Sequence, residues 1–541
     1  MQKKKVVILG GGLAGLSAAT ALSQSEEFEI TVIERAPMAG GCTSSWRDHR
    51  DADKSEIQYP MHMIFPTLYV NFLHLLKFIA LTRHVNLAAN LTPKFDRFFF
   101  FNENNRKSSL ALSPLTKKLP APLHGLKILW DFDGCGFFDK ISTLRFFLFC
   151  LRQGGKDIPP ASDQYNFYGF CKKLGMTEEA VKAMARITYS ITNLPPSEQV
   201  GPKFAKLFYE VILSHSDALG YQMINDDYTP GLIAPWVIFL KNSRVRFMFE
   251  HEVAGICHNG KCKVSGITAT NHNEGLRGEG PRFICANCGL RFHNVTAKIH
   301  CPKCGLILGY IPPPHPSPKF LEADYVVSCL QPHQLAEIIL ADEHHPLRQF
   351  DYFRKLGKYK GASLTISRMW LDKKYTFEDN LTGLDRHYFS FNGIMDISNI
   401  MPRYAEQSVF DTLSDDGDAL KMWSTETLKQ KLIKDMRRVF PETLSAAVTK
   451  HLLAHIWPRV LYHKAAPEIS SLYRPKSQQS PVDNLVLAGD WISTLEIGME
   501  GAVRSGLDAA NILLRKEGQP VWPIFRPERG LLPGWLENTR T

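Results

Sequence analysis

The sequence predicts an α/β fold in which a Rossmann-like nucleotide-binding domain is joined to a discontinuous α+β domain and carries an inserted four-cysteine zinc ribbon. Three observations support this prediction. A glycine-rich loop follows an apolar strand at the N-terminus, a second glycine-containing loop precedes a small-residue helix near residue 490, and two CxxC pairs lie between residues 285 and 304. The 541 residues, 44% of them hydrophobic, suffice for a large core and for two or three domains.

The first element in chain order is a strand, loop and helix, "KKVVILGGGLAGLSAATAL". Gly10 permits a tight turn after the strand, Gly12 lets a pyrophosphate approach the backbone, and Gly15 lets helix and strand pack closely. The strand "EITVIE" follows and ends at Glu34, 19 residues after Gly15. An acidic side chain at this spacing can bind ribose hydroxyls and would repel a 2′-phosphate. We therefore expect a dinucleotide site for FAD or NAD rather than NADP.

This start of the chain also imitates a secretory signal, because basic residues precede an apolar run. The strand that follows directly makes a folded βαβ unit the better interpretation. No run of about 18 apolar residues is present, so we expect no transmembrane helix. The sequence therefore predicts a cytoplasmic protein, with membrane association at the surface left open.

The net charge and its distribution limit the kinds of binding partner that we expect. The formal net charge of +10 is spread along the chain, which favours a solvated basic surface, with attraction to an anionic membrane as the main rival. No basic helix or aromatic-interleaved RNA motif is present, so a nucleic-acid partner is not expected.

The two ends of the chain resemble a known family. "VVILGGGLAGLSAATAL…VIERAPMAGG" and "NLVLAGDWI…MEGAVRSGLDAA" are similar to the FAD-dependent amine oxidase and phytoene desaturase superfamily. "SLYRPKSQQSPVDNLVLAGDW" and "RRVFPE" resemble its carotenoid desaturase and hydroxysqualene dehydroxylase branch most closely. In this superfamily the N-terminal and C-terminal segments close on one FAD.

The resemblance implies a set of FAD-binding residues: Gly10, Gly12, Leu13, Ala14, Gly15, Glu34, Arg35, Gly41, Cys42, Val253, Gly489, Asp490 and Met499. It places the stretch from Gly12 to Gly15 on the pyrophosphate and Glu34 on the adenosine ribose. Val253 would contact adenine through its backbone, and Asp490 the ribityl or pyrophosphate region. Met499 would begin a helix aimed at the isoalloxazine ring.

The sequence departs from the family pattern at two places near the flavin. Cys42 stands where the family often has arginine. A D-x-G-x-H segment is reduced to "QYPMH", with Gln58 and Pro60 at the other positions and only His62 retained. His62 could face the flavin or the substrate, or it could be a hydrogen-bonded structural histidine.

The paired CxxC motifs, Cys285-x2-Cys288 and Cys301-x2-Cys304, have the spacing of a zinc ribbon. Four thiolates fill a tetrahedral shell, so we expect structural zinc with no open position for a substrate. A redox CxxC or an iron centre is the alternative. The flanking segments read as strands, which predicts an insertion that could dock a protein partner.

We expect both large domains to be discontinuous. The predicted FAD-binding domain comprises residues 1–60, 231–345 with the ribbon at 272–320, and 471–515; the predicted substrate domain comprises 61–230 and 346–470; residues 516–541 form a tail. In the first substrate segment "LRFFLFCLRQ" could be a buried helix or a basic, aromatic wedge against a bilayer. In the second, Ser424-x-x-Thr427 predicts a capped helix.

These observations predict an FAD-dependent oxidoreductase that transfers hydride from an apolar isoprenoid, such as a carotenoid or squalene-type substrate, to flavin N5. The sequence identifies no catalytic side chain, which is expected when the cofactor performs the chemistry. Two alternatives stay open: a flavin amine oxidase that uses oxygen, and a flavoprotein that binds partners through the zinc ribbon.

Overall fold

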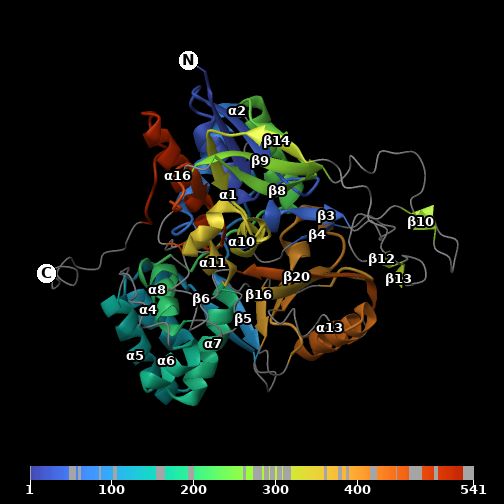
Figure 1. The fold of residues 1–541 in the computed structure, drawn as a ribbon. Coiled ribbons are helices and arrows are strands. Elements are labelled where there is room, and N and C mark those ends of the chain that lie inside the picture. The colour runs from blue at the N-terminus through green and yellow to red at the C-terminus, as the bar shows by residue number, and fades with distance from the viewer. Residues whose placement is uncertain are drawn as a thin grey trace.

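The computed structural model describes the chain in residues 2–47, 56–58, 62–83, 87–101, 107–153, 165–192, 200–217, 219–259, 263–271, 283–284, 291–292, 299–300, 307–308, 318–358, 362–375, 381–384, 389–414, 423–445, 447–461, 475, 478–492 and 498–527. Three groups of elements are visible (Figure 1). The N-terminal sheet lies at the top, a lobe of helices at the lower left, and a long mixed sheet with one covering helix at the lower right.

The N-terminal sheet is parallel and joins distant parts of the chain. Its strand order is β21-β15-β1-β2-β7, formed by Leu485–Leu487, Tyr325–Ser328, Lys4–Leu9, Phe28–Ile33 and Arg246–Met248. Helix α1, Leu13–Leu22, connects β1 to β2 and is buried along its whole length. The predicted strand, loop, helix and strand are therefore confirmed.

Small residues allow two helices from opposite ends of the chain to lie together. Helix α16 spans Gly498–Lys516 and packs along α1. A Cβ added at Gly506 would lie 2.1 Å from the backbone oxygen of Ala14. On the other side of α1, the indole Nε1 of Trp236 on α9, Ala234–Asn242, donates to Thr20 at 2.9 Å.

A second, antiparallel sheet extends this region in the order β14-β9-β8, formed by Lys319–Glu322, Val264–Asn271 and His251–His258. Helices α10, Pro332–Leu340, and α11, Asp351–Gly357, pack beside it. The segment predicted to form a ribbon lies between β9 and β14 in the chain. There the structure describes four short strands that pair as β10 with β11 and β12 with β13: Phe283–Ile284, Arg291–Phe292, Ile299–His300 and Ile307–Leu308.

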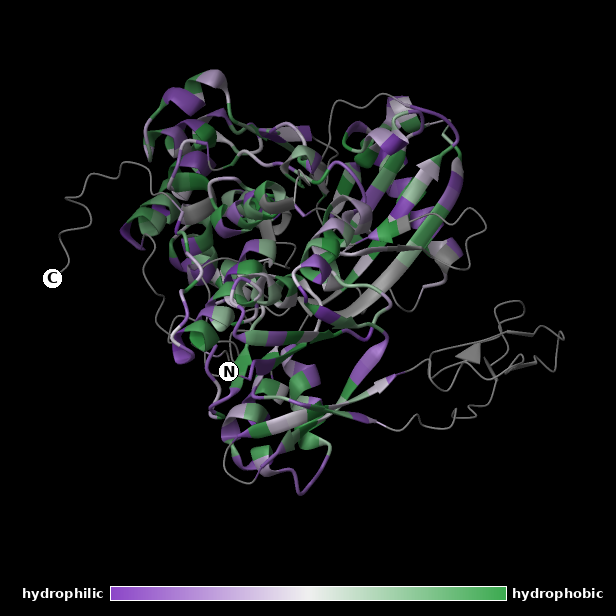
Figure 2. Cartoon of the chain, turned by 90° about the horizontal axis from the view of Figure 1, so that it is seen from above, coloured by the Kyte–Doolittle hydropathy of each residue, from purple (hydrophilic) through white to green (hydrophobic). Residues whose placement is uncertain are grey.

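The long mixed sheet combines both halves of the chain, in the order β20-β16-β19-β18-β17-β5-β6. The strands are Thr449–Leu461, Ala362–Leu371, Val409–Ser414, Gly393–Asp396, Leu381–Leu384, Arg97–Phe101 and Lys107–Ala111. Hydrophobic and hydrophilic residues alternate along the long strands (Figure 2). Helix α13, Thr425–Val439, covers one face with Leu432 and Met436. Its predicted cap is confirmed, because Ser424 Oγ accepts from Thr427 N at 3.1 Å.

The helical lobe contains α3 to α8: Pro114–Lys118, Leu123–Asp131, Phe137–Gln153, Phe167–Lys173, Glu178–Thr192 and Gly201–Phe208. Aromatic rings fill its centre, with Phe146 packed against Phe167, Phe204 and Phe208. "LRFFLFCLRQ" belongs to α5. One side of α5 is buried through Phe146, Phe147 and Cys150, while other apolar side chains of the same helix are exposed.

Among the described residues, none of the helices combines the length and the hydropathy needed to cross a bilayer. The described part of the C-terminal tail, up to residue 527, packs onto helix α2, Val70–Arg83. Trp522 of the tail is buried and lies edge-on to Phe78 at 4.8 Å between ring centroids.

Candidate functional site

The glycine loop after β1 forms an open backbone cradle. Gly10 has a φ of +98°, and a Cβ added at Gly15 would lie 2.0 Å from the Gly10 carbonyl oxygen. Side chains are therefore excluded at both positions. A Cβ added at Gly12 would meet no atom within 4 Å, so space is left where the N-terminus of α1 begins at Leu13 and Ala14. Free N–H groups at a helix N-terminus beside open space suit a phosphate group.

Glu34 lies at the end of β2 and faces the same loop. Its two carboxylate oxygens accept one hydrogen bond each, from Gly11 N and from Ala36 N, both at 2.8 Å. A carboxylate has about four acceptor positions, so both oxygens can still accept from ribose hydroxyls. Arg35, the next residue, lies at the surface with its guanidinium 3.6 Å from Glu252.

Val253 lies on β8 close to the end of β2. His251 N donates to the Glu34 carbonyl at 3.0 Å, which places the start of β8 beside Glu34. The Val253 side chain is buried in a cluster that includes Leu9 and Ile33. Val253 thus lies beside the C-terminal ends of β1 and β2, where the glycine loop also lies.

The second glycine pair closes on the first loop. Gly40 N donates to the Gly11 carbonyl at 2.8 Å. Gly41 has a φ of +55°, and a Cβ added there would lie 3.3 Å from the Gly12 Cα. Burial, reinforced by the negative charge of Asp490, raises the pKa of the next residue, Cys42, to about 12.

The C-terminal loop follows β21, which pairs in parallel with β15 as β15 does with β1, so the loop leaves the same edge of the N-terminal sheet as the glycine loop. Gly489, just after β21, has a φ of +147°, and its N–H donates to Ser505 of α16 at 3.0 Å. Burial raises the pKa of Tyr69 above its usual range, with smaller contributions from the charges of Glu500 and Asp490. Met499 is buried in the first turn of α16. Residues 493–497, between Asp490 and α16, lie outside the described residues.

The structure also identifies Glu500, which the sequence reasoning missed. This buried carboxylate accepts from Asn71 N at 3.0 Å, from Asn71 Nδ2 at 2.8 Å and from Phe72 N at 2.9 Å. It therefore binds N–H groups at the start of α2 that have no partner within that helix. An acidic residue among the small residues of "MEGAVRSG" was the available signal.

His62 and Gln58 both contact Tyr228, which precedes α9. The rings of His62 and Tyr228 are edge-on with centroids 5.0 Å apart, and His62 N donates to the tyrosine hydroxyl at 3.3 Å. Gln58 Oε1 accepts from Tyr228 N at 3.0 Å. These contacts give both residues structural partners, and a flavin-side role for His62 stays a prediction. Pro60 lies outside the described residues.

A buried charge network next to Tyr228 was also not predicted. Arg368 on β16 is fully buried and makes two hydrogen bonds with Asp411 on β19, at 2.6 and 2.8 Å. It makes a third with Asp227, at 2.7 Å. Burial raises the pKa of the Asp411 carboxyl, although the guanidinium favours its charged form. Buried charges need partners of opposite charge. Because Arg368 and Asp411 lie on the long mixed sheet and Asp227 precedes Tyr228, their pairing joins this sheet to the segment that holds Tyr228.

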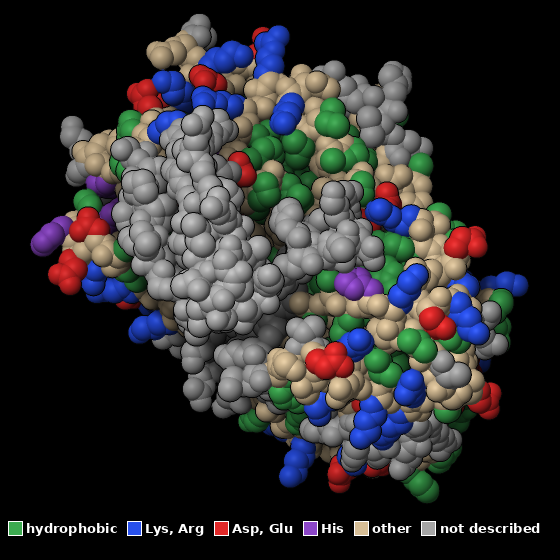
Figure 3. Space-filling view, turned by 90° about the vertical axis from the view of Figure 1, so that its right-hand side faces the viewer, with side chains coloured by type: hydrophobic (Ala, Val, Ile, Leu, Met, Phe, Trp, Pro, Cys, Tyr) green, Lys and Arg blue, Asp and Glu red, His purple; other side chains and the backbone are tan. Residues whose placement is uncertain are grey.

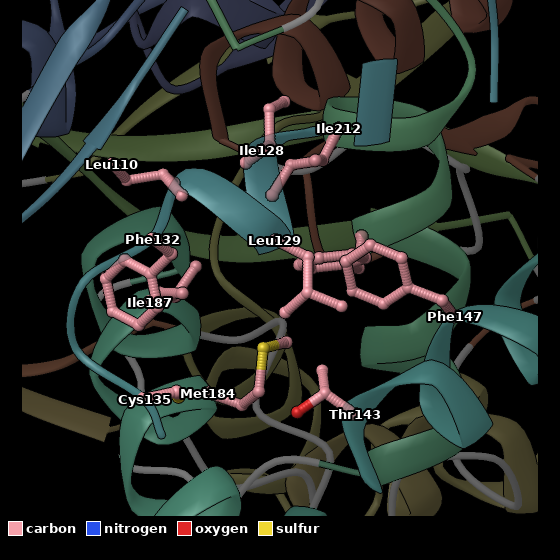
Figure 4. A pocket seen from close by; sticks show the side chains of 11 residues that line it. Leu110, Ile128, Leu129, Phe132, Cys135, Thr143, Phe147, Met184, Ile187 and Ile212 are labelled. Atoms are coloured by element: carbon pink, nitrogen blue, oxygen red, sulfur yellow. The ribbon is translucent and has the colours of Figure 1, made fainter. Parts of the chain in front are cut away.

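An apolar cavity lies inside the helical lobe. Leu129, Phe132, Phe147 and Met184 point into it from α4, α5, α7 and the turn after α4 (Figure 4). Its free volume of about 20 Å³ holds about one water-sized molecule. Apolar side chains also gather in a hollow on the face shown in Figure 3, where charged side chains of both signs surround them.

The four predicted zinc ligands, Cys285, Cys288, Cys301 and Cys304, lie outside the described residues. Within the part of the chain that the structure describes, no three His, Cys, Asp or Glu side chains are grouped so that they could hold a metal ion.

Comparisons with known proteins support the interpretation of the N-terminal and C-terminal segments as parts of a flavoprotein fold. The family model described as flavin containing amine oxidoreductase matches residues 281–514, and that described as NAD(P)-binding Rossmann-like domain matches residues 8–79. The chain is 24% identical to 15-cis-phytoene desaturase from Synechococcus elongatus, over 95% of this chain and 96% of that protein. It is 22% identical to zeta-carotene desaturase from Capsicum annuum, over 94% of this chain and 80% of that protein.

Solved structures share the fold. An oxidoreductase from Methanosarcina mazei aligns with a TM-score of 0.61 at 13% identity, covering 93% of this chain and 99% of that one. Cyclohexylamine oxidase from Brevibacterium oxydans aligns with a TM-score of 0.58 at 14% identity, covering 96% of this chain and all of that one. The glycine cradle, the carboxylate of Glu34 beside it, the family models and the relatives that align over nearly the whole chain agree: the chain is an FAD-dependent oxidoreductase that is similar to the amine oxidases and the carotenoid desaturases.

Proposed function

We propose that this protein introduces double bonds into a long apolar isoprenoid of the carotenoid or squalene type. The observation that carries the proposal is the similarity to phytoene and zeta-carotene desaturases, which extends over nearly the whole chain rather than over the nucleotide-binding segments alone. The amine oxidases among the solved structures share the fold at 14% identity or close to it, and this likeness does not define a substrate.

The residues around the glycine cradle fit FAD. The backbone from Gly12 to Gly15 would hold the pyrophosphate, Glu34 the adenosine ribose, and Asp490 the ribityl side. When bound, FAD supplies the hydride acceptor. The N-terminus of α16 would point toward the flavin. Its positive potential would stabilise the negative charge that the reduced flavin ring carries. The chain itself would bind the polyene, align the C–H bonds and keep water away.

Product analysis tests this proposal. Incubation of the holoprotein with a detergent-dispersed acyclic isoprenoid should yield a product lighter by two hydrogen atoms and with a longer conjugated system. Mass spectrometry and absorbance report both changes. Recovery of the isoprenoid unchanged, together with turnover of an aliphatic amine, would favour the oxygen-dependent amine oxidase.

We also propose that Cys285, Cys288, Cys301 and Cys304 bind one structural zinc ion. Each CxxC pair falls between two short paired strands, one pair between β10 and β11 and the other between β12 and β13. Two strand pairs, each with a CxxC motif in the sequence between its strands, suit a tetrahedral four-thiolate site. A closed site of this kind suits a docking module for a protein partner in the cytoplasm.

Metal analysis of the purified protein should find about one zinc per chain, as four thiolates fill one tetrahedral shell. Cys301→Ser should lose the metal, whereas Cys257→Ser, a matched change on β8, should retain it. Equal zinc content in the two variants would contradict the ligand set, and iron in place of zinc would favour the alternative centre.

A further inference from the structure

The hydroxyl of Tyr69 is a buried hydrogen-bonding group that has no partner among the described residues. Tyr69 directly precedes helix α2, and its side chain belongs to a residue that is only 8% exposed. Tyrosine hydroxyls at buried positions usually find a partner. A hydroxyl that lacks one beside a cofactor site is therefore a candidate for contact with the cofactor.

The Tyr69 hydroxyl lies at the start of helix α16. A Cβ added at Gly498, the first residue of this helix, would lie 3.5 Å from the tyrosine oxygen. The first N–H groups of a helix have no partner within the helix and carry a positive partial charge. The hydroxyl and these N–H groups therefore form a cluster of hydrogen-bond donors at one end of α16.

This end of α16 extends past the glycine cradle. Helices α1 and α16 run in the same direction, because Gly506 lies beside Ala14 at the start of α1 and Gln519, after α16, accepts from Ser25, after α1, at 3.0 Å. The part of α16 from Gly506 back to Gly498 projects about 12 Å beyond the start of α1, at 1.5 Å per residue. The ribityl chain of FAD would separate the flavin ring from a pyrophosphate at the cradle by a similar length. The ring would then lie within reach of the tyrosine.

Hydrogen bonds to the neighbouring residues hold Tyr69 in place. Glu500, in the first turn of α16, accepts from the N–H groups of Asn71 and Phe72. The side-chain amide of Asn71 makes two further bonds with the backbone of Phe525 in the C-terminal tail, at 2.8 and 2.9 Å. The Tyr69 ring lies edge-on to that of Phe72, with centroids 6.3 Å apart. Three segments of the chain thus fix the hydroxyl before any ligand binds, which lowers the entropy cost of a contact.

The Tyr69 hydroxyl is a neutral donor. Burial raises the pKa of Tyr69, and the negative charges of Glu500 and Asp490 raise it further. The proton therefore stays on the oxygen at neutral pH. A hydrogen bond of this kind is stronger when its acceptor carries negative charge, and the reduced flavin ring carries such a charge.

We propose that the Tyr69 hydroxyl donates a hydrogen bond to the flavin ring of FAD and, together with the N-terminus of α16, stabilises the reduced form of the ring. Tyr69 is then a catalytic residue that raises the reduction potential of the flavin, and the bond itself transfers neither a proton nor an electron. The proposal goes beyond the proposed function, because it does not depend on which substrate delivers the electrons.

Reductive titration of the holoprotein with dithionite, in the presence of a reference dye, tests the proposal. Tyr69→Phe removes one oxygen atom and keeps the aromatic ring. The equilibrium constant for reduction of its flavin should fall about tenfold, which lowers the midpoint potential by about 30 mV for a two-electron couple. The matched control, Tyr352→Phe on α11, also removes a buried hydroxyl that has no partner among the described residues. It should keep the wild-type potential.

Titration of the flavin-free protein with FAD separates this effect from a loss of structure. Oxidised FAD should bind Tyr69→Phe about two- to tenfold more weakly, as expected for the loss of one neutral hydrogen bond. An unchanged potential in Tyr69→Phe, with or without weaker binding of FAD, would overturn the proposal. So would an equal fall of the potential in the control variant. Because dithionite replaces the substrate, a failure to oxidise an isoprenoid would count against the proposed function alone.

Discussion

Asp490 and Cys42 come from opposite ends of the chain, yet the charge of one affects the ionisation of the other. Gly40 and Gly41 hold Cys42 next to the first glycine loop, and β21 brings Asp490 to the same edge of the N-terminal sheet. The two segments predicted to hold FAD are therefore placed by the fold itself.

The ionisation of Cys42 provides a test at this scale. With a pKa of about 12 in the folded protein and about 8.5 in an unfolded chain, its thiolate at pH 8 should be roughly a thousandfold rarer in the folded state. Alkylation of the Cys42 peptide, followed by mass spectrometry, should accordingly be much slower before denaturation than after. Asp490→Asn should accelerate the native reaction, because it removes a negative charge that disfavours the thiolate.

Asp483 is exposed and lies just before β21, whereas Asp490 lies after it. Asp483→Asn is therefore the matched control and should leave the alkylation rate of Cys42 unchanged. Equal rates in all three proteins would mean that Asp490 does not lie near Cys42.

Single residues also show where sequence reasoning stops. The position of Glu34 beside the glycine loop could be predicted, because a strand, a loop and a helix fix its distance along the chain from the glycines. Glu500 and Arg368 could not, because their partners, Asn71 and Asp227, are 429 and 141 positions away. A buried charge of this kind is determined by the tertiary structure.

At the scale of elements, the contact between α1 and α16 ties the two cofactor segments together. Gly506→Val should force the helices apart, because its first added carbon would lie 2.1 Å from the Ala14 carbonyl oxygen. We expect a loss of about 1–3 kcal/mol in the free energy of unfolding and a lower FAD content after purification. Urea denaturation and flavin absorbance measure the two effects.

Arg515→Val places the same β-branched residue at an exposed position of α16 and controls for helix propensity. A Gly506→Val protein as stable and as rich in FAD as this control would contradict the role assigned to the helix contact.

Elements with local signals were predicted well. The βαβ unit and the Ser424 cap follow from residues within one or two turns of each other. Helix α5 was harder, because "LRFFLFCLRQ" is apolar on more than one side and a buried and a lipid-facing helix share that pattern. The structure divides its apolar residues between the core, with Phe146 and Phe147, and the surface, with Phe137 and Phe138.

At the scale of the whole molecule, one polypeptide passes repeatedly between two sheets. The long mixed sheet takes β5 and β6 from the first half of the chain and β16 to β20 from the second. The sequence indicated that the domains are discontinuous, but local patterns do not determine strand order, since β17 pairs with β5 across more than 280 positions. Figure 1 shows how this arrangement sets the helical lobe beside the sheet.

The central claim is that an apolar isoprenoid delivers its electrons to the FAD held between the two ends of the chain. Anaerobic mixing of the holoprotein with a detergent-dispersed acyclic isoprenoid, followed by visible absorbance, tests it most directly. We predict that the oxidised flavin band disappears with the isoprenoid and persists with an aliphatic amine. A band that persists with the isoprenoid and disappears with the amine would contradict the claim.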